Sequence, residues 1–504
     1  MIVDFFLTNR PLWAVLISLV AAGLILLSDR RPNLRETITM LAAVGKFVIV
    51  LTMLPDVLAG QVVESAPLKL APGISLHLRA DALGLLFALL SSGLWVVTSV
   101  YSIGYMRSMK YGHETGYYAS FAVCLSAAVG IALAANLLTF FVFYEILTIA
   151  TYPLVVHART PEAVSGGRKY LVYTLTAGQL LLIAVVWAQV VAPGAEFRPG
   201  GFLAGRITPP ALDIMFILFI LGLGVKAAIM PLHDWLPTAM VAPTPVSALL
   251  HAVAVVKAGA FGFLRITGYV FGPELLKETN LGSLLAWIAA LTIIVASLRA
   301  LAEDNLKRRL AYSTVGQLSY VVLGAALITP MSLVGGMFHI VAHAFMKITL
   351  FFCAGAIYVT THKENVSEMD GIGRQMPLTM GAFTLGSLGI VGMPFVVGFV
   401  SKWNLGLGAL QAGHPIFVAV LVASALLSTG YFFPIVYKAY FGQTRETYSR
   451  HEAKPSLLYP LVLTALVSLV LGIMPNFGLS FYQLAKMAAK SIIASGMVLA
   501  GGGQ

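Results

Sequence analysis

The chain has 504 residues, of which 59% are hydrophobic and only 11% are charged, and its formal net charge is +11. Soluble domains contain about 25% charged residues, so this chain lacks the charge needed to cover the surface of a soluble protein of its length. The composition excludes a soluble protein and predicts an integral membrane protein.

Fourteen apolar segments are long enough to cross a membrane as helices, since a spanning helix needs roughly 20 apolar residues. Helix is the expected state because the bilayer offers no water to unpaired backbone groups. The segments cover residues 12–28, 36–55, 82–105, 116–134, 136–156, 166–192, 211–233, 243–270, 281–300, 309–328, 331–359, 378–400, 414–440 and 457–475. We therefore predict an all-α polytopic membrane protein with about 14 transmembrane helices.

A last apolar stretch, at 478–500, is interrupted by Lys486 and Lys490. We expect it to lie at the membrane interface or along the side of the bundle. The first segment is followed, not preceded, by its basic residues Arg30 and Arg31, which favours a true span over a signal peptide.

Positive charge is distributed unevenly between the two sides. Connections that follow odd-numbered segments carry 18 of the 32 Lys and Arg residues, and the opposite side, with both termini, carries 9. Cytoplasmic loops are enriched in Lys and Arg, so we predict that the odd-numbered connections are cytoplasmic and both termini are outside. The charge is spread over short loops, which excludes a basic nucleic-acid-binding domain.

No segment carries a phosphate-binding loop, a haem motif or a cysteine cluster. Cys124 and Cys353 are single thiols in apolar segments and are expected to pack there. We expect no cofactor, no metal and no catalytic chemistry in this chain. An ion gradient or a partner subunit would then drive any transport.

Two segments combine Gly, Pro and one Lys within an apolar span. One contains Lys226 and Pro231, and the other contains Pro394 and Lys402. Pro removes a helix hydrogen bond and Gly lowers helix propensity, and interrupted helices in corresponding positions of two halves often mark a transport site. We predict broken helices at these segments rather than simple kinks.

Ionisable residues inside the predicted spans are the candidate functional residues, because each charge at the bilayer centre costs about 2.5–3.5 kcal/mol on insertion scales. Glu145 lies in the middle of a span, and Lys226, in a span of similar depth, is its expected ion-pair partner. The alternative is a static ion pair, although such pairs often fail to stabilise a fold.

His339, His343 and Lys347 recur every four residues, which places them on one helix face. His titrates near neutrality, and three such groups in a row can pass a proton along if water fills the gaps. A single core histidine would more often be structural, but three together favour a relay.

His251 and Lys257 lie six residues apart, about 120° around an ideal helix. They can therefore face different neighbours, one toward Lys226 and one toward Lys347. Lys402, near the second broken helix, would end this line.

Other charged residues are expected to have structural roles. Lys46 is expected to be structural, either near a helix end or with its amine reaching the membrane interface. Asp81 and Asp213 are expected to be solvated caps at span starts, and the basic loop 303–309 is expected to anchor the topology.

Residues 231–259, which include Trp235, His251 and Lys257, resemble the antiporter-like subunit family. This family includes Mrp-type Na⁺/H⁺ antiporters, proton-pumping subunits of respiratory complex I and membrane-bound hydrogenases. Segments 304–314, 339–347 and 398–402 match it in order, and the resemblance covers nearly the whole chain. The run 240–259, and Lys402 rather than Glu at its position, are most similar to the D-type subunit of the Mrp antiporter.

The resemblance implies two inverted five-helix repeats, helices 4–8 and 9–13, with helices 7 and 12 broken. The corresponding divisions are 1–110 for helices 1–3, 111–272 and 273–445 for the two repeats, and 446–504 for helix 14 and the tail. It also implies an ion pair of the Glu145 and Lys226 side chains, and a central proton path. The implied path comprises His251, Lys257, Lys347 and Lys402.

The resemblance further implies other hydrophobic subunits as partners, exchange of H⁺ for Na⁺, and a bacterial or archaeal cell membrane. Two residues depart from the family pattern: Thr238 stands where Asp is common, and Phe395 replaces the second proline of Gly-x-Pro-Pro. The first departure could alter proton access, and the second could soften the break in helix 12.

Three other functions are alternatives in principle. A proton-pumping subunit of a redox-driven complex would have the same buried groups and remains the alternative. An organic-solute carrier would need a roomy polar or aromatic pocket, and a scaffold would have no use for so many buried charges.

Overall fold

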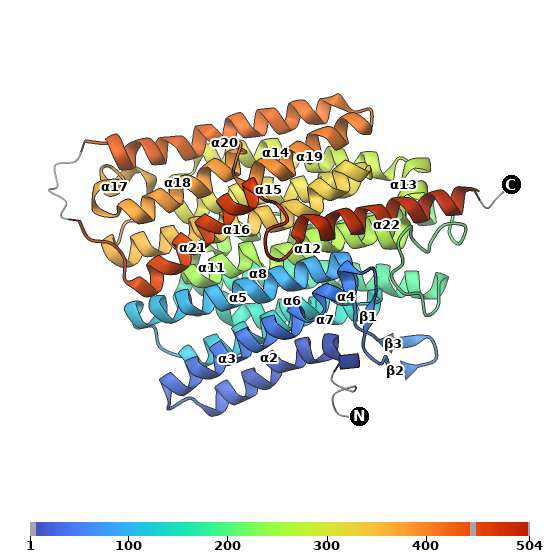
Figure 1. Cartoon of the computed structure of the whole chain (residues 1–504), viewed down its shortest axis with the longest axis horizontal. Helices are drawn as coiled ribbons and strands as arrows, with labels where there is room; N and C mark the ends of the chain where they lie inside the picture. The colour runs from blue at the N-terminus through green and yellow to red at the C-terminus, as the bar shows by residue number, and fades with distance from the viewer. Residues whose placement is uncertain (1–6, 444–449, 502–504) are drawn as a thin grey trace.

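The computed structural model describes residues 7–443 and 450–501, and the described chain is mainly helical (Figure 1). The long helices are α2 (Arg10–Leu27), α3 (Pro32–Leu51), α5 (Ala82–Met109), α6 (Glu114–Ala132), α7 (Leu137–Val155), α8 (Pro161–Val191), α9 (Ala211–Ala227), α12 (Val255–Arg265), α14 (Leu281–Ala302), α15 (Leu306–Leu327), α16 (Pro330–Thr361), α18 (Pro377–Val391), α19 (Val397–Gln411), α20 (Pro415–Phe441), α21 (Pro455–Ile473) and α22 (Phe481–Gly501). The short elements are α4 (Leu54–Leu58), α10 (Trp235–Thr238), η1 (Ala239–Val241), α11 (Thr244–Ala252), η2 (Ile266–Phe271), α13 (Pro273–Glu278), η3 (Val366–Glu368) and α17 (Ile372–Gln375). The strands are β1 (Val63–Glu64), β2 (Leu68–Ala71), β3 (Ile74–Leu76) and β4 (Arg79–Ala80), and they form two antiparallel pairs, β1 with β4 and β2 with β3.

The predicted spans correspond to helices of the structure. Within the described residues, twelve helices are long and apolar enough to cross a membrane. The two other predicted spans, 211–233 and 378–400, are the interrupted ones, in which α9 is followed by α10 and α18 by α19. Both predicted helix breaks are therefore confirmed.

Connections after even-numbered spans lie together on one face of the bundle. The Ala135 amide donates to the His77 carbonyl at 2.9 Å, the Phe197 amide donates to Ala135 at 2.7 Å, and the Gly200 amide donates to Gly268 at 3.0 Å. Strands β1 to β4 lie at this end of the molecule (Figure 1). These hydrogen bonds satisfy backbone groups that leave the helices.

Connections after odd-numbered spans meet at the opposite face. There the Leu306 amide donates to the Glu364 carbonyl at 2.9 Å, and the Arg35 guanidinium donates to the Thr115 hydroxyl at 3.0 Å. Alternate connections thus lie on alternate faces, as fourteen spans require.

Burial separates a central group of helices from a lipid-facing ring. The span that contains α11 and α12 is buried along 100% of its most apolar window, and α16 along 94%, whereas α20 is buried along only 33%. Helices buried on all sides can hold ionisable groups away from lipid. Helices such as α20 expose apolar side chains, as a lipid-facing position requires.

The C-terminal stretch forms α22, which packs along α16 and α5. Leu484, Ala488 and Ile492 on its inner face are buried. The stretch therefore lies along the side of the bundle, one of the two positions expected from the sequence.

A buried ion pair joins the start of α5 to the end of α12. The Asp81 carboxylate accepts the Gly84 amide at 2.7 Å as an N-terminal cap, and it also binds both terminal nitrogens of Arg265. The Arg265 side chain is 2% exposed. Asp81 is therefore a cap, as predicted, but it pairs with a buried cation instead of being simply solvated. Burial raises the pKa of Asp81, but the neighbouring Arg265 charge outweighs this and holds the pKa below its ordinary value.

Replacing Asp81→Asn keeps an oxygen for the cap but leaves the Arg265 charge buried and unpaired. We expect the free energy of unfolding to fall by about 3 kcal/mol, measured by thermal unfolding in detergent. Asp56→Asn is the control, because its partner Arg10 lies at a more exposed site and such pairs contribute about 0–1 kcal/mol. Equal losses for the two variants would contradict this role.

The same pair predicts the acid sensitivity of the fold. Because the folded-state pKa of Asp81 is depressed, its stabilising contribution is present above the unfolded value of about 3.9. It is lost only as the pH falls through the lowered folded value.

Candidate proton-translocation site

Lys257 and His343 are in direct contact at the centre of the bundle. The Lys257 Nζ lies 2.8 Å from His343 Nδ1 and donates to the Ile340 carbonyl at 3.0 Å. Both side chains are 0% exposed. A hydrogen bond therefore links α12 to α16, although it joins Lys257 to His343 and not to Lys347, toward which the sequence predicted the link.

His339 continues this line along α16. Its ring centroid lies 6.1 Å from that of His343, its Nδ1 lies 2.8 Å from the Ser401 hydroxyl, and its ring stacks on Tyr320 at 5.2 Å. Tyr320 lies on α15 and Ser401 on α19, so His339 connects three helices.

Lys402 lies at the far end of this line, beside the second broken helix. Its Nζ is 5.0 Å from the Tyr320 ring centroid and donates to the Ile390 and Val391 carbonyls, at 2.5 and 3.2 Å. These are the last carbonyls of α18, and the C-terminal end of a helix attracts a cation. The break thus provides the acceptors for the buried amine.

The sequence departure at Phe395 does not prevent this break. Gly392 ends α18 at φ 93°, and Phe395 itself adopts φ 70° before α19 begins. The left-handed backbone at these two positions replaces the missing second proline in interrupting the helix.

Lys226 lies at the end of the first half of the other broken helix, but it does not contact Glu145. Its Nζ donates to the Tyr144 carbonyl at 2.5 Å and lies 3.3 Å from the centroid of the Tyr144 ring. Glu145 Oε1 is buried without a hydrogen-bond partner in the protein, and its carboxylate lies against Gly178 of α8. The direct ion pair predicted from the sequence is therefore not formed in this structure.

His251 and Lys257 do not belong to one continuous helix. The amides of Val253 and Ala254 both donate to the Leu249 carbonyl, at 3.1 and 3.0 Å, and α12 begins only at Val255. The angle of about 120° expected for an ideal helix was therefore wrong, since this interruption changes the direction of the chain between the two residues.

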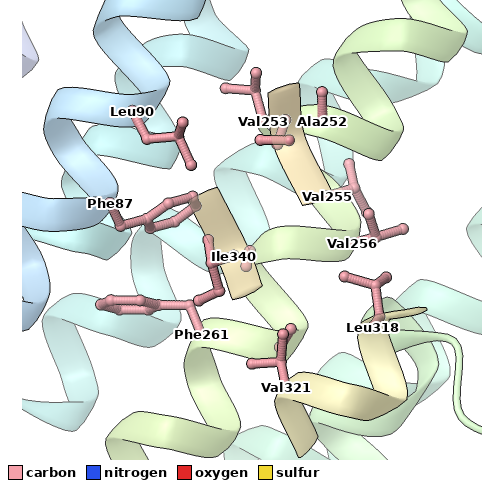
Figure 2. Packing of buried hydrophobic residues seen from close by; sticks show 14 of the residues in the cluster. Phe87, Leu90, Ala252, Val253, Val255, Val256, Phe261, Leu318, Val321 and Ile340 are labelled. Carbon is pink, nitrogen blue, oxygen red and sulfur yellow. The ribbon is translucent and has the colours of Figure 1, made fainter. Parts of the chain in front are cut away.

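Apolar side chains surround the interruption (Figure 2). Val256 lies near Leu318 of α15, and Val253 belongs to the same apolar cluster as Ile340 of α16. All four residues are 0% exposed. The interruption therefore lies within the apolar core.

His251 and Lys347 each contact residues outside the series of Lys257, His343 and His339. The His251 ring stacks on Phe351 at 4.6 Å and its Nε2 lies 3.3 Å from the Met240 sulfur. Lys347 Nζ donates to the Leu310 carbonyl at 3.0 Å. Both residues are 0% exposed, so the structure places them in the buried group without a direct hydrogen bond to Lys257.

A polar cavity of about 410 Å³ opens at the face that carries the odd-numbered connections. Met240 lines this cavity and also contacts His251. Its other walls include Asp234, Thr238, Lys307, Tyr312 and Glu364. One apolar side chain therefore stands between an open polar cavity and a buried histidine.

Two sequence interpretations bear on this cavity. The loop 303–309 was expected only to anchor the topology, but Lys307 lines the cavity and donates to the Ala242 carbonyl at 2.8 Å. Thr238, which replaces a common Asp, also faces it, beside Asp234. Asp234 supplies the nearby carboxylate and pairs with Lys169.

Several buried polar atoms along these helices have no hydrogen-bond partner in the protein. They are His251 Nδ1, His339 Nε2, His343 Nε2, Gln317 Oε1 and Tyr320 OH. Buried polar groups normally find a partner, often an ordered water. These atoms mark where water can join the ionisable groups.

The sequence did not identify Gln317, Tyr320 and Ser401 as residues of the candidate site. Gln317 was detectable as an amide within a predicted span. Tyr320 and Ser401 carry no distinctive sequence signal, because they join the site only through packing against His339. Within the described residues, no group of three or more His, Cys, Asp or Glu is arranged to hold a metal ion.

Comparisons with known proteins identify the family. The family described as "NADH:quinone oxidoreductase/Mrp antiporter, TM" matches residues 134–428. The chain belongs to this family. The resemblance predicted from residues 231–259 and 339–347 is thus confirmed.

Relatives in the NADH:quinone oxidoreductase/Mrp antiporter family cover most of the chain. The N-type subunit of NADH-quinone oxidoreductase from Desulforudis audaxviator is 33% identical over 416 residues, covering 80% of this chain and 82% of that protein. The D-type subunit of the Na⁺/H⁺ antiporter from Bacillus subtilis is 27% identical over 403 residues, covering 79% and 80%. A chain of the Mrp complex from Dietzia sp. superposes with a TM-score of 0.87 at 22% identity, covering 99% of both chains. The last match shows the fold.

In this family member, Gly259 allows α12 to approach the end of α9 next to Lys226. A Cβ atom at Gly259 would lie 2.2 Å from the Ala227 nitrogen and 2.7 Å from the Lys226 carbonyl carbon. Both contacts are with backbone, which cannot move aside cheaply. A side chain here would push Lys226 away from the centre of the bundle.

Gly259→Ala is expected to lower the free energy of unfolding by about 1–3 kcal/mol through overpacking, and to reduce proton transport because Lys226 is displaced. Thermal unfolding and proton flux in vesicles measure the two effects. Gly406→Ala in α19 is the matched control, since no atom lies within 4 Å of its added Cβ. Indistinguishable behaviour of the two variants would refute the close-approach argument.

Proposed function

We propose that this chain is the proton-translocating subunit of a multisubunit antiporter that exchanges H⁺ for a monovalent cation, Na⁺. One observation carries the proposal: the buried Lys257, His343 and His339 and the partly buried Lys402 form a series, the buried series, in which hydrogen bonds and ring contacts link neighbouring groups, with Tyr320 between His339 and Lys402. A solute carrier would need a binding cavity among these groups, whereas a proton needs only groups that exchange it in turn.

The relatives are consistent with two sources of energy for proton transport, an ion gradient and a redox reaction. The likeness to a D-type subunit of an Na⁺/H⁺ antiporter, together with Lys402 at the second broken helix, favours the antiporter. The higher identity to an N-type subunit of NADH-quinone oxidoreductase favours the second candidate, a proton-pumping subunit of a redox-driven complex. The buried series would serve either one.

The proposed topology follows the distribution of positive charge. Odd-numbered connections, including the cavity lined by Met240, face the cytoplasm, and both termini lie outside. Helices 4–8 and 9–13 form two inverted repeats, roughly 111–272 and 273–445, between an N-terminal unit of helices 1–3 and a C-terminal unit from 446 onward. The proposed membrane is a bacterial or archaeal cell membrane, and the proposed partners are other hydrophobic subunits.

The proposed switch is the distance between Glu145 and Lys226. In a closed state the carboxylate would lie about 4 Å from the amine and stabilise its charge by about 4 kcal/mol at an effective dielectric near 20. That energy changes proton binding by about a thousandfold. Contact between Lys226 and Tyr144 would represent the open state, in which Lys226 passes its proton toward the centre of the bundle.

Protons would enter through the polar cavity. Met240 both lines the cavity and contacts His251, so water must pass its side chain to reach the histidine. Lys347 and Lys257 would receive the proton next, and Lys402 would lead it toward the other face or a neighbouring subunit.

Glu145→Ala and Lys226→Ala should each abolish proton-coupled transport while the protein still inserts into the membrane. The assay is proton flux in vesicles that contain the purified complex, with protein levels measured in parallel. Lys69→Ala, at an exposed lysine of β2, should transport normally. Full transport by either test variant would rule out the switch.

Subunit composition decides between the two driving forces. Gentle purification followed by mass spectrometry should recover small hydrophobic subunits, and sodium-dependent proton flux should follow an imposed gradient. Recovery of iron–sulfur or nickel subunits would instead support the redox-driven complex.

Met240→Phe should slow proton flux by about tenfold, equivalent to an added barrier of about 1.4 kcal/mol, because a larger rigid ring would block water between the cavity and His251. Val241→Phe is the matched control, since Val241 lines the same cavity and the structure shows no contact between it and His251. Slowing of both variants to the same degree would indicate a general effect on the cavity instead of access past Met240.

A further inference from the structure

Lys46 is a buried lysine far from the series described above. It lies in α3, and its side chain is 0% exposed. Its Nζ donates to the Leu125 carbonyl of α6 at 3.0 Å and lies 5.4 Å from the Trp95 ring centroid. The expected position at the membrane interface was therefore wrong.

The groups around Lys46 do not neutralise its charge. No carboxylate of the described residues lies within 4.0 Å of its Nζ. Along this stretch α2 presents no titratable side chain and α5 contributes Trp95, while Tyr118 lies on α6 before Leu125. An ammonium group has three donors, and one backbone carbonyl is the hydrogen-bond acceptor that the protein provides.

One face of α5 beside Lys46 carries polar atoms that lack partners. Ser91, Trp95 and Ser99 are spaced by four residues and so share this face. Ser91 Oγ, Trp95 Nε1 and Ser99 Oγ are all buried without a hydrogen-bond partner in the protein, and so is Tyr118 OH on α6. Buried polar atoms in such a row are the usual partners of ordered water.

We call Ser91, Trp95, Ser99 and Tyr118 the polar seam. Tyr118 is the member nearest the face that carries the odd-numbered connections. Tyr118 lies near the beginning of α6, and the Arg35 guanidinium lies 5.2 Å from its ring centroid. Arg35 in turn binds Glu114 and Thr115 at that face. Tyr118 thus lies beside the charged residues at that end of the bundle.

The opposite side of α6 leads toward the central series. Cys124, next to Leu125, has its sulfur 3.4 Å from the Thr151 hydroxyl of α7, and α7 also carries Tyr144, which contacts Lys226. A single helix therefore separates Lys46 from the surroundings of Lys226.

Static packing does not account for this arrangement. Methionine would fill similar space without the cost of a buried charge, and alanine would leave no unpaired hydroxyl at 91 or 99. We propose that Lys46 is a second proton-binding site, which exchanges protons through water held along Ser91, Trp95, Ser99 and Tyr118. This inference rests on the proposed proton transport and adds helices α3, α5 and α6 to its path.

The test uses the complete complex in vesicles, with Lys46→Met and Lys46→Arg. Methionine removes the titratable amine at similar length, whereas arginine keeps a charge and donors but does not release its proton. Both variants should lower proton flux by about tenfold, equivalent to an added barrier of about 1.4 kcal/mol, and change its pH profile at matched protein levels, because neither side chain can bind and release a proton in turn. Wild-type flux and pH profile in Lys46→Met, or full flux in Lys46→Arg, would overturn the proposal. Lys46 would then only hold α3 against α6.

A double variant, Ser91→Ala with Ser99→Ala, tests the seam if the lysine variants do not assemble. It removes two hydroxyls with little change in volume and should also lower the flux. Its control is Ser18→Ala, because the Ser18 hydroxyl already donates to the Val15 carbonyl at 3.3 Å. Normal flux in the double variant would contradict a hydrated seam.

Lys257→Ala, measured in parallel, separates the two proposals. Loss of flux in Lys257→Ala with normal flux in the Lys46 and seam variants would reject only the second site. Normal flux in Lys257→Ala would reject the proposed proton transport itself.

Discussion

A charge inside a bilayer has no water to bind, and the protein meets this constraint with backbone carbonyls instead of counter-ions. Each of the four fully buried lysines in the described spans donates to a carbonyl, as does the partly buried Lys402, and none of the five has a carboxylate within 4.0 Å. The pairs are Lys46 with Leu125, Lys226 with Tyr144, Lys257 with Ile340, Lys347 with Leu310, and Lys402 with Ile390. A neutral acceptor orients the amine without holding its proton as a carboxylate would, which suits groups that bind and release protons in turn.

The interrupted helices create some of these acceptors. A continuous helix uses its carbonyls internally, whereas the last turn of a helix leaves them free. Lys402 binds the free carbonyls at the end of α18, and Lys226 lies in the last turn of α9. Breaking a helix inside the membrane is tolerated where the irregular backbone is enclosed by protein, and at Lys226 the close approach of Gly259 provides that enclosure.

Apolar packing is as important as the polar groups. Val253, Val256, Leu318 and Ile340 fill the space around the interruption between α11 and α12 (Figure 2), and Met240 closes the polar cavity from His251. A continuous water-filled path would let protons leak down their gradient without coupling. In the proposed mechanism, apolar barriers between the ionisable groups make each proton transfer depend on a change in structure, as coupling to another ion or to a partner subunit requires.

The sequence by itself determined the membrane class, the number of spans, the two broken helices and the identity of the ionisable residues. These follow from composition, from segment length and from the cost of a charge in lipid, all of which are local properties. Only the tertiary structure decided which groups touch. Glu145 and Lys226 proved to be apart because Tyr144 offers the amine a carbonyl and a ring. His251 and Lys257 diverge because the chain breaks between them, and Lys46 is fully enclosed because α5 and α6 cover it. Contacts between distant segments depend on how helices pack, and a span's own residues do not specify its neighbours.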